Sequence, residues 1–303
     1  SDKIRGTANA EGSIYIESGA QLLSTGGKIW LAGGLDDGGA DASITADRGK
    51  WASVDAADGL PDGYATGWNQ NDYWGVGVVI GANVNIKSSN GDIFIAGQQG
   101  LSGTSGYGHV GIWYSTTIDS GNGKIAIWAR SPAGANQSTQ GIALHNDVHN
   151  YGPVVITSNS PTADAITLYS DSSASSGSWA RGITSAWYSA WDNARGHQGA
   201  QILATSLGGG IAITGIGGGG SGSSDAVGVR LDYTDILARS GPITINGMSS
   251  SSASSQGLAV GRDSGSNSAV RLGGWKAGTT GAVGGGTFTT TAGTFDLSTS
   301  TSP

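Results

Sequence analysis

The stretch Gly123-Lys124-Ile125-Ala126-Ile127 decides the fold, because its pattern recurs along the chain. A glycine, any residue and two aliphatic residues separated by one position make a short strand, with alternate side chains on opposite faces. The other copies are Gly12-Ser13-Ile14-Tyr15-Ile16, Gly27-Lys28-Ile29-Trp30-Leu31, Gly91-Asp92-Ile93-Phe94-Ile95, Gly152-Pro153-Val154-Val155-Ile156, Gly209-Gly210-Ile211-Ala212-Ile213, Gly241-Pro242-Ile243-Thr244-Ile245 and a degenerate Val270-Arg271-Leu272.

The spacing of these copies indicates a repeat. Their first aliphatic residues lie at 29, 93, 125, 154, 211, 243 and 270, with gaps of 64, 32, 29, 57, 32 and 27 residues. The two long gaps are twice the short ones, so degraded copies are expected near 61 and near 183. Self-similarity with a period of about 30 residues is the signature of a solenoid, which a β-sandwich does not show.

Each period carries two further apolar points. The second strand reads Gly77-Val78-Val79-Ile80, Gly111-Ile112-Trp113-Tyr114, Gly141-Ile142-Ala143-Leu144, Ala165-Ile166-Thr167-Leu168, Gly228-Val229-Arg230-Leu231 and Gly257-Leu258-Ala259-Val260. The third lies at Val84/Ile86, Ile118, Val148 and Ile236. Three short strands per period make a three-sided coil, and stacked coils pair in parallel about 4.8 Å apart.

We therefore predict an all-β fold, a three-sided parallel β-helix of about nine coils of about 30 residues each. It forms a single domain over 1–303, with long loop insertions near 46–76 and 169–198. One lumenal ladder is expected to contain Ile93, Ile125, Val154, Ile211 and Ile243. The only helix candidate is 185–195, where a short helix and a decorated corner both stay open and the corner is favoured.

Composition limits the classes of function. Only 12% of residues are charged, the net charge is −7, and basic residues form no stripe, which argues against nucleic acid as a partner. No apolar run of about 20 residues exists, so no membrane insertion is expected. There is no cysteine, and stability must come from the ladder and the core. The first residue is Ser1, so we expect a processed chain or an excised piece.

Parts of the sequence resemble the repeats of filamentous-haemagglutinin-like adhesins, which are exported by two-partner secretion. The resemblance is carried by 20–33, which reads AQLLSTGGKIWLAG, and by 84–95, which reads VNIKSSNGDIFI, with an echo in AQIL at 200–203 before Gly209-Gly210-Ile211. It implies a right-handed β-helix, export from the cell, and an adhesive or structural role. The tryptophan content and the long loops depart from that family.

The residue types and their spacing favour no catalytic residue and no cofactor. Glycan-cleaving β-helices need clustered acids on one exposed sheet face, and the acids here are sparse. Asp36, Asp37 and Asp41 share one glycine-rich loop and are a weak candidate for a Ca²⁺ site, although solvated turn aspartates explain them better. No other metal site is expected, and we predict that the chain is not an enzyme.

Tryptophan is the unusual residue, with 10 in a charge-poor chain. Trp30, Trp113 and Trp128 take outward positions in their strands, and Trp187, Tyr188 and Trp191 cluster in the second insertion. Outward aromatic rings pack under loops or subunits, which is the favoured reading, or form a platform for sugar rings. These six residues are the candidate contacts to glycans or to a partner.

The expected function is that of an extracellular structural or adhesive β-helix, a segment or subunit of a bacterial cell-surface adhesin or fibre. The alternative is a β-helix that binds or degrades polysaccharide. Neither end shows a cap, so we expect each end to pair with another copy head to tail or with a longer parent chain. Glycans and a host or neighbouring cell surface are the other expected partners. Aspartate is expected to disrupt the coil at Ile127 or Ile245 and to be nearly silent at Lys124 or Thr244.

Overall fold

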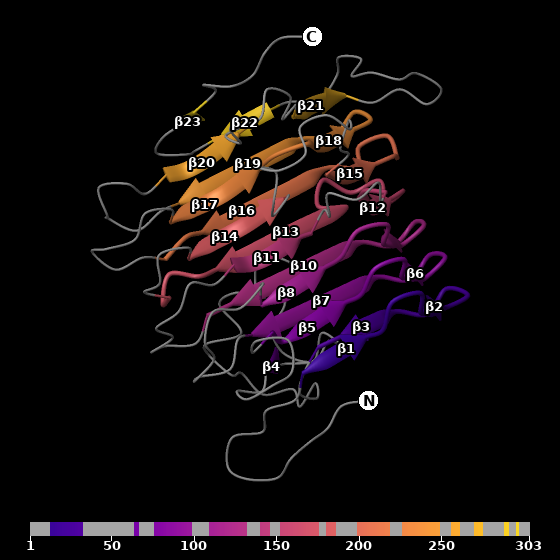
Figure 1. The fold of residues 1–303 in the computed structure, drawn as a ribbon. Coiled ribbons are helices and arrows are strands. Elements are labelled where there is room, and N and C mark those ends of the chain that lie inside the picture. The colour runs from indigo at the N-terminus through magenta and orange to yellow at the C-terminus, as the bar shows by residue number, and fades with distance from the viewer. Residues whose placement is uncertain are drawn as a thin grey trace, which may run out of the picture.

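Parallel strands form the described part of this computed structural model, which covers 13–32, 64–66, 76–98, 109–131, 140–145, 152–175, 180–185, 199–218, 226–248, 256–260, 270–274, 288–290 and 295–296. Within these ranges every regular element is a strand and there is no helix. The strands form three sheets, and the strands of each sheet stack one after another along the same axis (Figure 1).

The strands of each sheet pair only in parallel. The first sheet contains β1 (Ile14–Ile16), β5 (Val78–Ile80), β8 (Val110–Ile112), β11 (Gln140–Leu144), β14 (Arg181–Ser185), β17 (Val227–Leu231), β20 (Gln256–Val260) and β23 (Phe295–Asp296). The second contains β2 (Gln21–Leu23), β6 (Asn85–Lys87), β9 (Thr117–Asp119), β12 (Val154–Ser158), β15 (Ala200–Ala204), β18 (Thr234–Ala238) and β21 (Arg271–Gly274). The third contains β3 (Ile29–Leu31), β4 (Ala65–Thr66), β7 (Ile93–Gln98), β10 (Ile125–Arg130), β13 (Ile166–Asp171), β16 (Ile211–Ile216), β19 (Ile243–Met248) and β22 (Phe288–Thr290).

The chain visits the three sheets in turn, which confirms the three-sided parallel β-helix. The described residues make seven complete coils and the first strand of an eighth, where about nine were expected. One missing coil lies in the 64-residue gap, because Ile29 pairs directly with Ile93. Ala65 pairs with Gly97 farther along the same strand, so 33–63 interrupts one third-sheet strand. The other missing coil lies between Ile125 and Ile211, because Ile166 is the single rung that pairs with both.

The lumenal ladder of the third sheet differs from the expected one at a single rung. Ile125 pairs with Ile166, and Ile166 pairs with Ile211. Val154 lies instead in the second sheet beside Ala200. The degenerate copy at 270–272 also belongs to the second sheet, where Leu272 pairs with Ile236. The alternation of apolar residues is the same in all three sheets, so it reveals a strand but not its side of the coil.

The second insertion is narrower than expected. Residues up to Asp171 complete β13, and Arg181–Ser185 form β14. The expected degraded copy near 183 is therefore wrong as a rung of the third sheet, because Ile183 pairs with Ile142 and Val229 in the first sheet. Ser185 thus ends a strand, and the rest of the helix candidate lies outside the described residues. Most of 46–76 also lies outside them, except for 64–66, which includes β4, and Val76.

The lumen is filled by aliphatic side chains from all three sheets. In β10, Ile125 and Ile127 are completely buried in the core, while Lys124 before the strand and Arg130 at its end remain partly exposed. Burying one such isoleucine contributes about 2–3 kcal/mol. β-Branched residues suit these strands because their stiff side chains pack well on a pleated surface.

Three corners join the sheets, and they differ in length. The second corner, from the second to the third sheet, is short and fully described in the first six coils, for example at 88–92 and 120–124. At the third corner, from the third back to the first sheet, the two sheets nearly touch. A Cβ on Gly97 would lie 2.2 Å from the His109 carbonyl oxygen, and one on Gly215 would lie 2.2 Å from that of Gly228.

Candidate functional site

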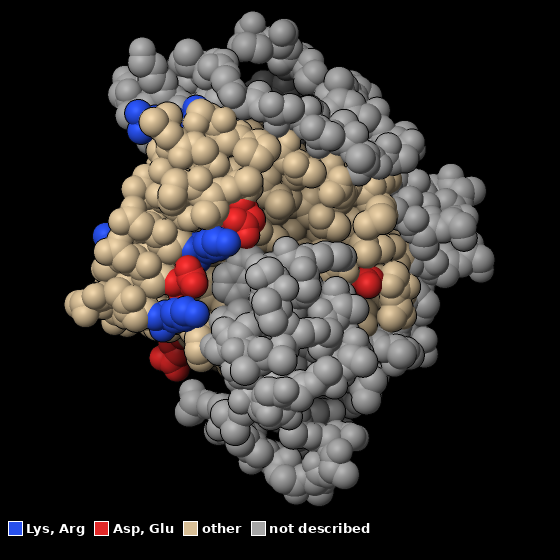
Figure 2. Space-filling model, turned by 180° about the vertical axis from the view of Figure 1, so that it is seen from behind, with Lys and Arg blue, Asp and Glu red and all other residues tan. Residues whose placement is uncertain are grey.

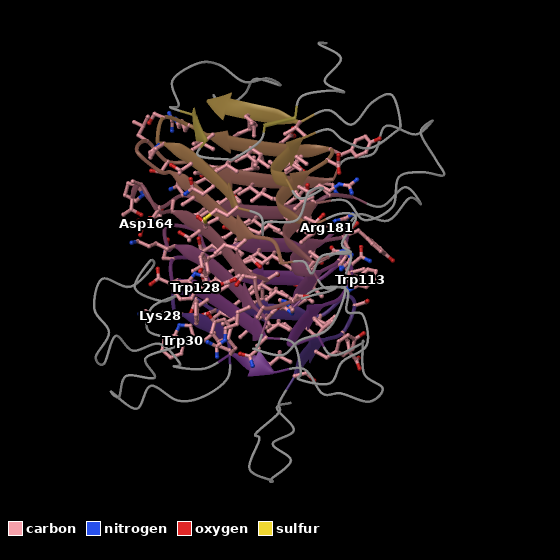
Figure 3. All side chains as sticks on the ribbon, turned by 90° about the vertical axis from the view of Figure 1, so that its left-hand side faces the viewer. Lys28, Trp30, Trp113, Trp128, Asp164 and Arg181 are labelled. Atoms are coloured by element: carbon pink, nitrogen blue, oxygen red, sulfur yellow. The ribbon has the colours of Figure 1, made fainter. Side chains whose placement is uncertain are left out.

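The three described candidate tryptophans lie in three different environments. Trp30 on β3 is 41% exposed, and the Lys28 ammonium lies 5.8 Å from the centre of its ring. Trp128 on β10 is completely buried. Trp113 is half-buried and directly follows β8. Figure 3 shows Trp30 and Trp128 on one side of the rod and Trp113 on the opposite side, so the three cannot form one flat platform.

Trp128 belongs to an aromatic cluster on the outer face of the third sheet. Its ring meets Phe94 edge-on at 5.5 Å and Tyr169 at 6.1 Å, on the neighbouring strands β7 and β13. Tyr64 joins the cluster, and the Arg130 guanidinium lies 4.6 Å from the Tyr64 ring centre. The expectation that Trp128 points away from the lumen is correct, but its burial makes it a packing residue and excludes it from contact with a glycan.

Trp113 stacks on a histidine of the next coil. The rings of Trp113 and His145 lie 4.5 Å apart with an interplanar angle of 21°. Both residues directly follow the paired residues Ile112 and Leu144, so the register of the first sheet brings them together. The arrangement orders the Trp113 ring, which is what an aromatic contact site requires.

His109 closes a coil at the third corner. Its Nε2 lies 2.9 Å from the Ser131 hydroxyl, which joins the start of β8 to the end of β10. His109 is fully buried, and this burial lowers the pKa of its imidazole to about 3. Its Nδ1 has no hydrogen-bond partner, and within the described ranges no carboxylate completes a catalytic triad with His109 and Ser131.

The second corner carries a feature that the sequence search missed, an asparagine ladder formed by Asn90, Asn122 and Asn159. The Asn122 Nδ2 donates to Asn90 Oδ1 at 2.7 Å, and the Asn159 Nδ2 donates to Asn122 Oδ1 at 2.7 Å. The sequence does contain a sign of this ladder, because the four-residue segments 88–91 and 120–123 both read Ser-x-Asn-Gly, 32 residues apart. Each coil therefore satisfies the polar side chains of the next.

A charge stripe runs beside the ladder and consists of Lys28, Asp92, Lys124 and Asp164. Lys28 Nζ lies 3.9 Å from Asp92, and Lys124 Nζ lies 2.8 Å from Asp164. Figure 2 shows acidic and basic side chains alternating up this side of the molecule. Partial burial acts to raise the pKa of the Asp164 carboxyl, but hydrogen bonds from Lys124 and Thr162 and the Lys124 charge hold it below its usual value.

The remaining candidates lie outside the described residues. These are the Ca²⁺ candidates Asp36, Asp37 and Asp41, and the aromatic group Trp187, Tyr188 and Trp191. Within the described ranges, no group of three or more His, Cys, Asp or Glu residues could hold a metal ion. The same ranges contain no helix with the length and apolarity of a transmembrane span.

Comparison with protein-family models, with curated proteins and with solved structures finds no match to this chain. Arguments about its function therefore depend on the geometry of the coil.

Proposed function

We propose that this chain is an extracellular structural and adhesive β-helix, a segment or subunit of a bacterial cell-surface adhesin or fibre, and not an enzyme. The observation that carries the proposal is the asparagine ladder with its charge stripe, in which polar side chains at a partly exposed corner bind the next coil. Such a surface stiffens a rod. The resemblance of 20–33 and 84–95 to filamentous-haemagglutinin-type repeats agrees with this role.

The ends of the rod support a partner of the same kind. Among the described strands, β1, β2 and β3 each have a neighbour on one side only, and so do β21, β22 and β23 at the other end. Unpaired strand edges attract further strands. We propose that these ends pair with another copy head to tail or with more of a longer parent chain. Contacts of this kind are heterologous and give open fibres.

Microscopy and light scattering across a dilution series test the structural role. We expect rods or fibres that lengthen with concentration. A monomer at every concentration, with terminal amides as well protected from exchange as those of the central coils, would contradict head-to-tail assembly. Incubation with a panel of polymeric glycans tests the proposal that the chain is not an enzyme. New reducing ends or unsaturated sugars would show that it cleaves glycans and would contradict that proposal.

The stacked Trp113 and His145 favour a second candidate function, the binding of polysaccharide at the corner after β8. Replacing Trp113 with alanine should then abolish binding to a glycan array, while Trp30→Ala, on the opposite side of the rod, should leave it unchanged. Equal binding by both variants and the parent chain would exclude this site.

A further inference from the structure

The second corner combines two residue types for separate structural reasons. Asparagine suits the ladder, because at Asn122 the amide donates to one coil and accepts from the other. The next position requires glycine, because a Cβ on Gly123 would lie 2.2 Å from the Gly91 carbonyl oxygen and one on Gly91 would lie 2.3 Å from that of Gly27. At these two rungs the fold thus favours the Asn-Gly pair. This dipeptide is the one most prone to deamidation, because glycine offers no steric barrier to ring closure.

We propose that Asn90 is a site of spontaneous deamidation, and that the hydrogen bonds of the corner set the order in which the Asn-Gly pairs of this chain react. The Gly91 backbone nitrogen loses its proton and attacks Cγ of Asn90, so that a nitrogen–carbon bond forms and the bond from Cγ to Nδ2 breaks. The amide leaves as ammonia with that proton. Water then opens the succinimide to aspartate or isoaspartate.

Hydrogen bonds at the attacking nitrogen separate the rungs. The Gly91 N–H donates to the Ser88 carbonyl only over 3.5 Å, whereas the Gly123 N–H donates to Ser120 over 3.1 Å. The Ser160 N–H, which follows Asn159, is held by the Ser158 hydroxyl at 3.1 Å, and serine hinders ring closure. Asn90 therefore has the least restrained nucleophile.

Hydrogen bonds at the side-chain amide point the same way. The Asn122 amide is held at both ends, by Asn90 and by Asn159. Asn90 lies at the N-terminal end of the ladder and uses its Oδ1 to accept from both the Nδ2 and the backbone N–H of Asn122. An aspartate at position 90 would still accept both bonds, so the first reaction leaves the ladder connected.

A third Asn-Gly pair provides an internal control. Asn246 and Gly247 lie inside β19, where Gly247 pairs with Gly215 of β16. Ring closure there would require the strand to leave the sheet. We expect the order Asn90, then Asn122, with Asn246 and Asn159 unchanged.

Peptide mapping by mass spectrometry, with enzymatic detection of isoaspartate, tests the order after the full chain is kept in mildly alkaline buffer. In the folded chain Asn90 should convert about tenfold faster than Asn122, the effect of one or two added hydrogen bonds. In guanidinium the three Asn-Gly pairs should convert at similar rates.

The variant Asn90→Gln keeps an amide but disfavours the five-membered ring, so it should abolish the product at position 90 and leave conversion at Asn122. Equal rates at Asn90 and Asn122 in the folded chain, faster conversion at Asn122, or an intact Asn90 when the unfolded chain has converted would overturn the proposal.

Discussion

The outer face of the third sheet differs between its N-terminal and C-terminal halves, although isoleucine lines the same lumenal column in both halves. On β7, β10 and β13 the outward side chains include Phe94, Trp128 and Tyr169, all buried. On β16 and β19 the outward side chains include Thr214 and Asn246, both half-buried, and the amide of Asn246 lies 3.5 Å from the Thr214 hydroxyl.

The difference teaches that the register of the third sheet follows its lumenal column and not its outer face. Isoleucine lines one lumenal column through five successive coils of the third sheet, at Ile93, Ile125, Ile166, Ile211 and Ile243. The outer face can change from aromatic to small and polar without a change in register. The outward residues therefore reflect the surroundings of each half, whereas the lumenal residues reflect the coil itself.

The largest expected effect lies on the lumenal side, where the two halves should behave alike. Ile127→Asp in the N-terminal half and Ile245→Asp in the C-terminal half each put an unpaired charge into an apolar lumen. Each should cost more than about 4 kcal/mol of unfolding free energy, measured by thermal or denaturant melts. The matched variants Ile127→Val and Ile245→Val should lose only about 1 kcal/mol. A small effect of either aspartate would mean that the inward and outward assignments are reversed.

The outer faces should respond differently to truncation. Trp128→Ala removes the centre of the buried aromatic cluster and should cost about 3–5 kcal/mol. Thr214→Ala, at the matching outward position two coils away, should change stability by less than about 1 kcal/mol. If the two variants lost equal stability in denaturant melts, the contrast between the halves would not hold.

Acid should weaken the N-terminal half selectively. The pKa of His109 is about 3 in the folded chain and 6.5 in the unfolded chain, so only the unfolded chain takes up this proton between those values. Stability should then fall as the pH drops from about 6.5 to 3, by about 4 kcal/mol in total. Hydrogen exchange across this range should show β8 and β10 opening before β17 and β19.

The variant His109→Phe separates the imidazole from the carboxylates that also titrate in acid. It should flatten the pH dependence relative to the parent chain, whatever its effect at neutral pH. An unchanged slope would assign the acid sensitivity to other groups.

The smallest effect concerns the charge stripe. The outward position of Lys124 predicts that aspartate is silent there, but Lys124 bonds Asp164 at 2.8 Å and its backbone N–H bonds Asp92 at 2.9 Å. Lys124→Asp should therefore lose up to about 1 kcal/mol, and less at high salt, because the pair is partly exposed. Thr244 makes no bond to an acidic residue among the described contacts, so Thr244→Asp should leave the unfolding free energy nearly unchanged in the same melts.

The sequence predicted the strands better than their assignment to sheets. The copies at 77–80, 111–114 and 141–144 were correctly placed in one sheet, but the middle copy is shifted by two residues, because Val78 and Ile142 pair with Val110 rather than with Ile112. The copy at 165–168 was wrongly grouped with them, because Ile166 pairs with Ile125 in the third sheet. Val154 was wrongly placed beside Ile125. Its strand lies in the second sheet, but the strand and the proline-containing turn before it have the same local pattern as a strand of the third sheet. The alternation within a strand does not reveal how many residues the neighbouring corner contains.

The candidate site was predicted less completely. The outward direction of Trp128 followed from alternation, but its burial depends on Phe94 and Tyr169, which are 34 and 41 residues away in the sequence. The asparagine ladder was visible as two copies of Ser-x-Asn-Gly, yet Asn159 joins it from a different local sequence, Ser-Asn-Ser-Pro.

The sequence by itself determined that this protein is a three-sided coil of short strands with an aliphatic lumen, because alternation and period are local properties that survive without contacts. Only the tertiary structure decided which strand stacks on which, which tryptophan is buried, and which polar side chains pair across coils. Those outcomes depend on the register between segments about 30 to 60 residues apart, and register is set by the packing of neighbouring coils.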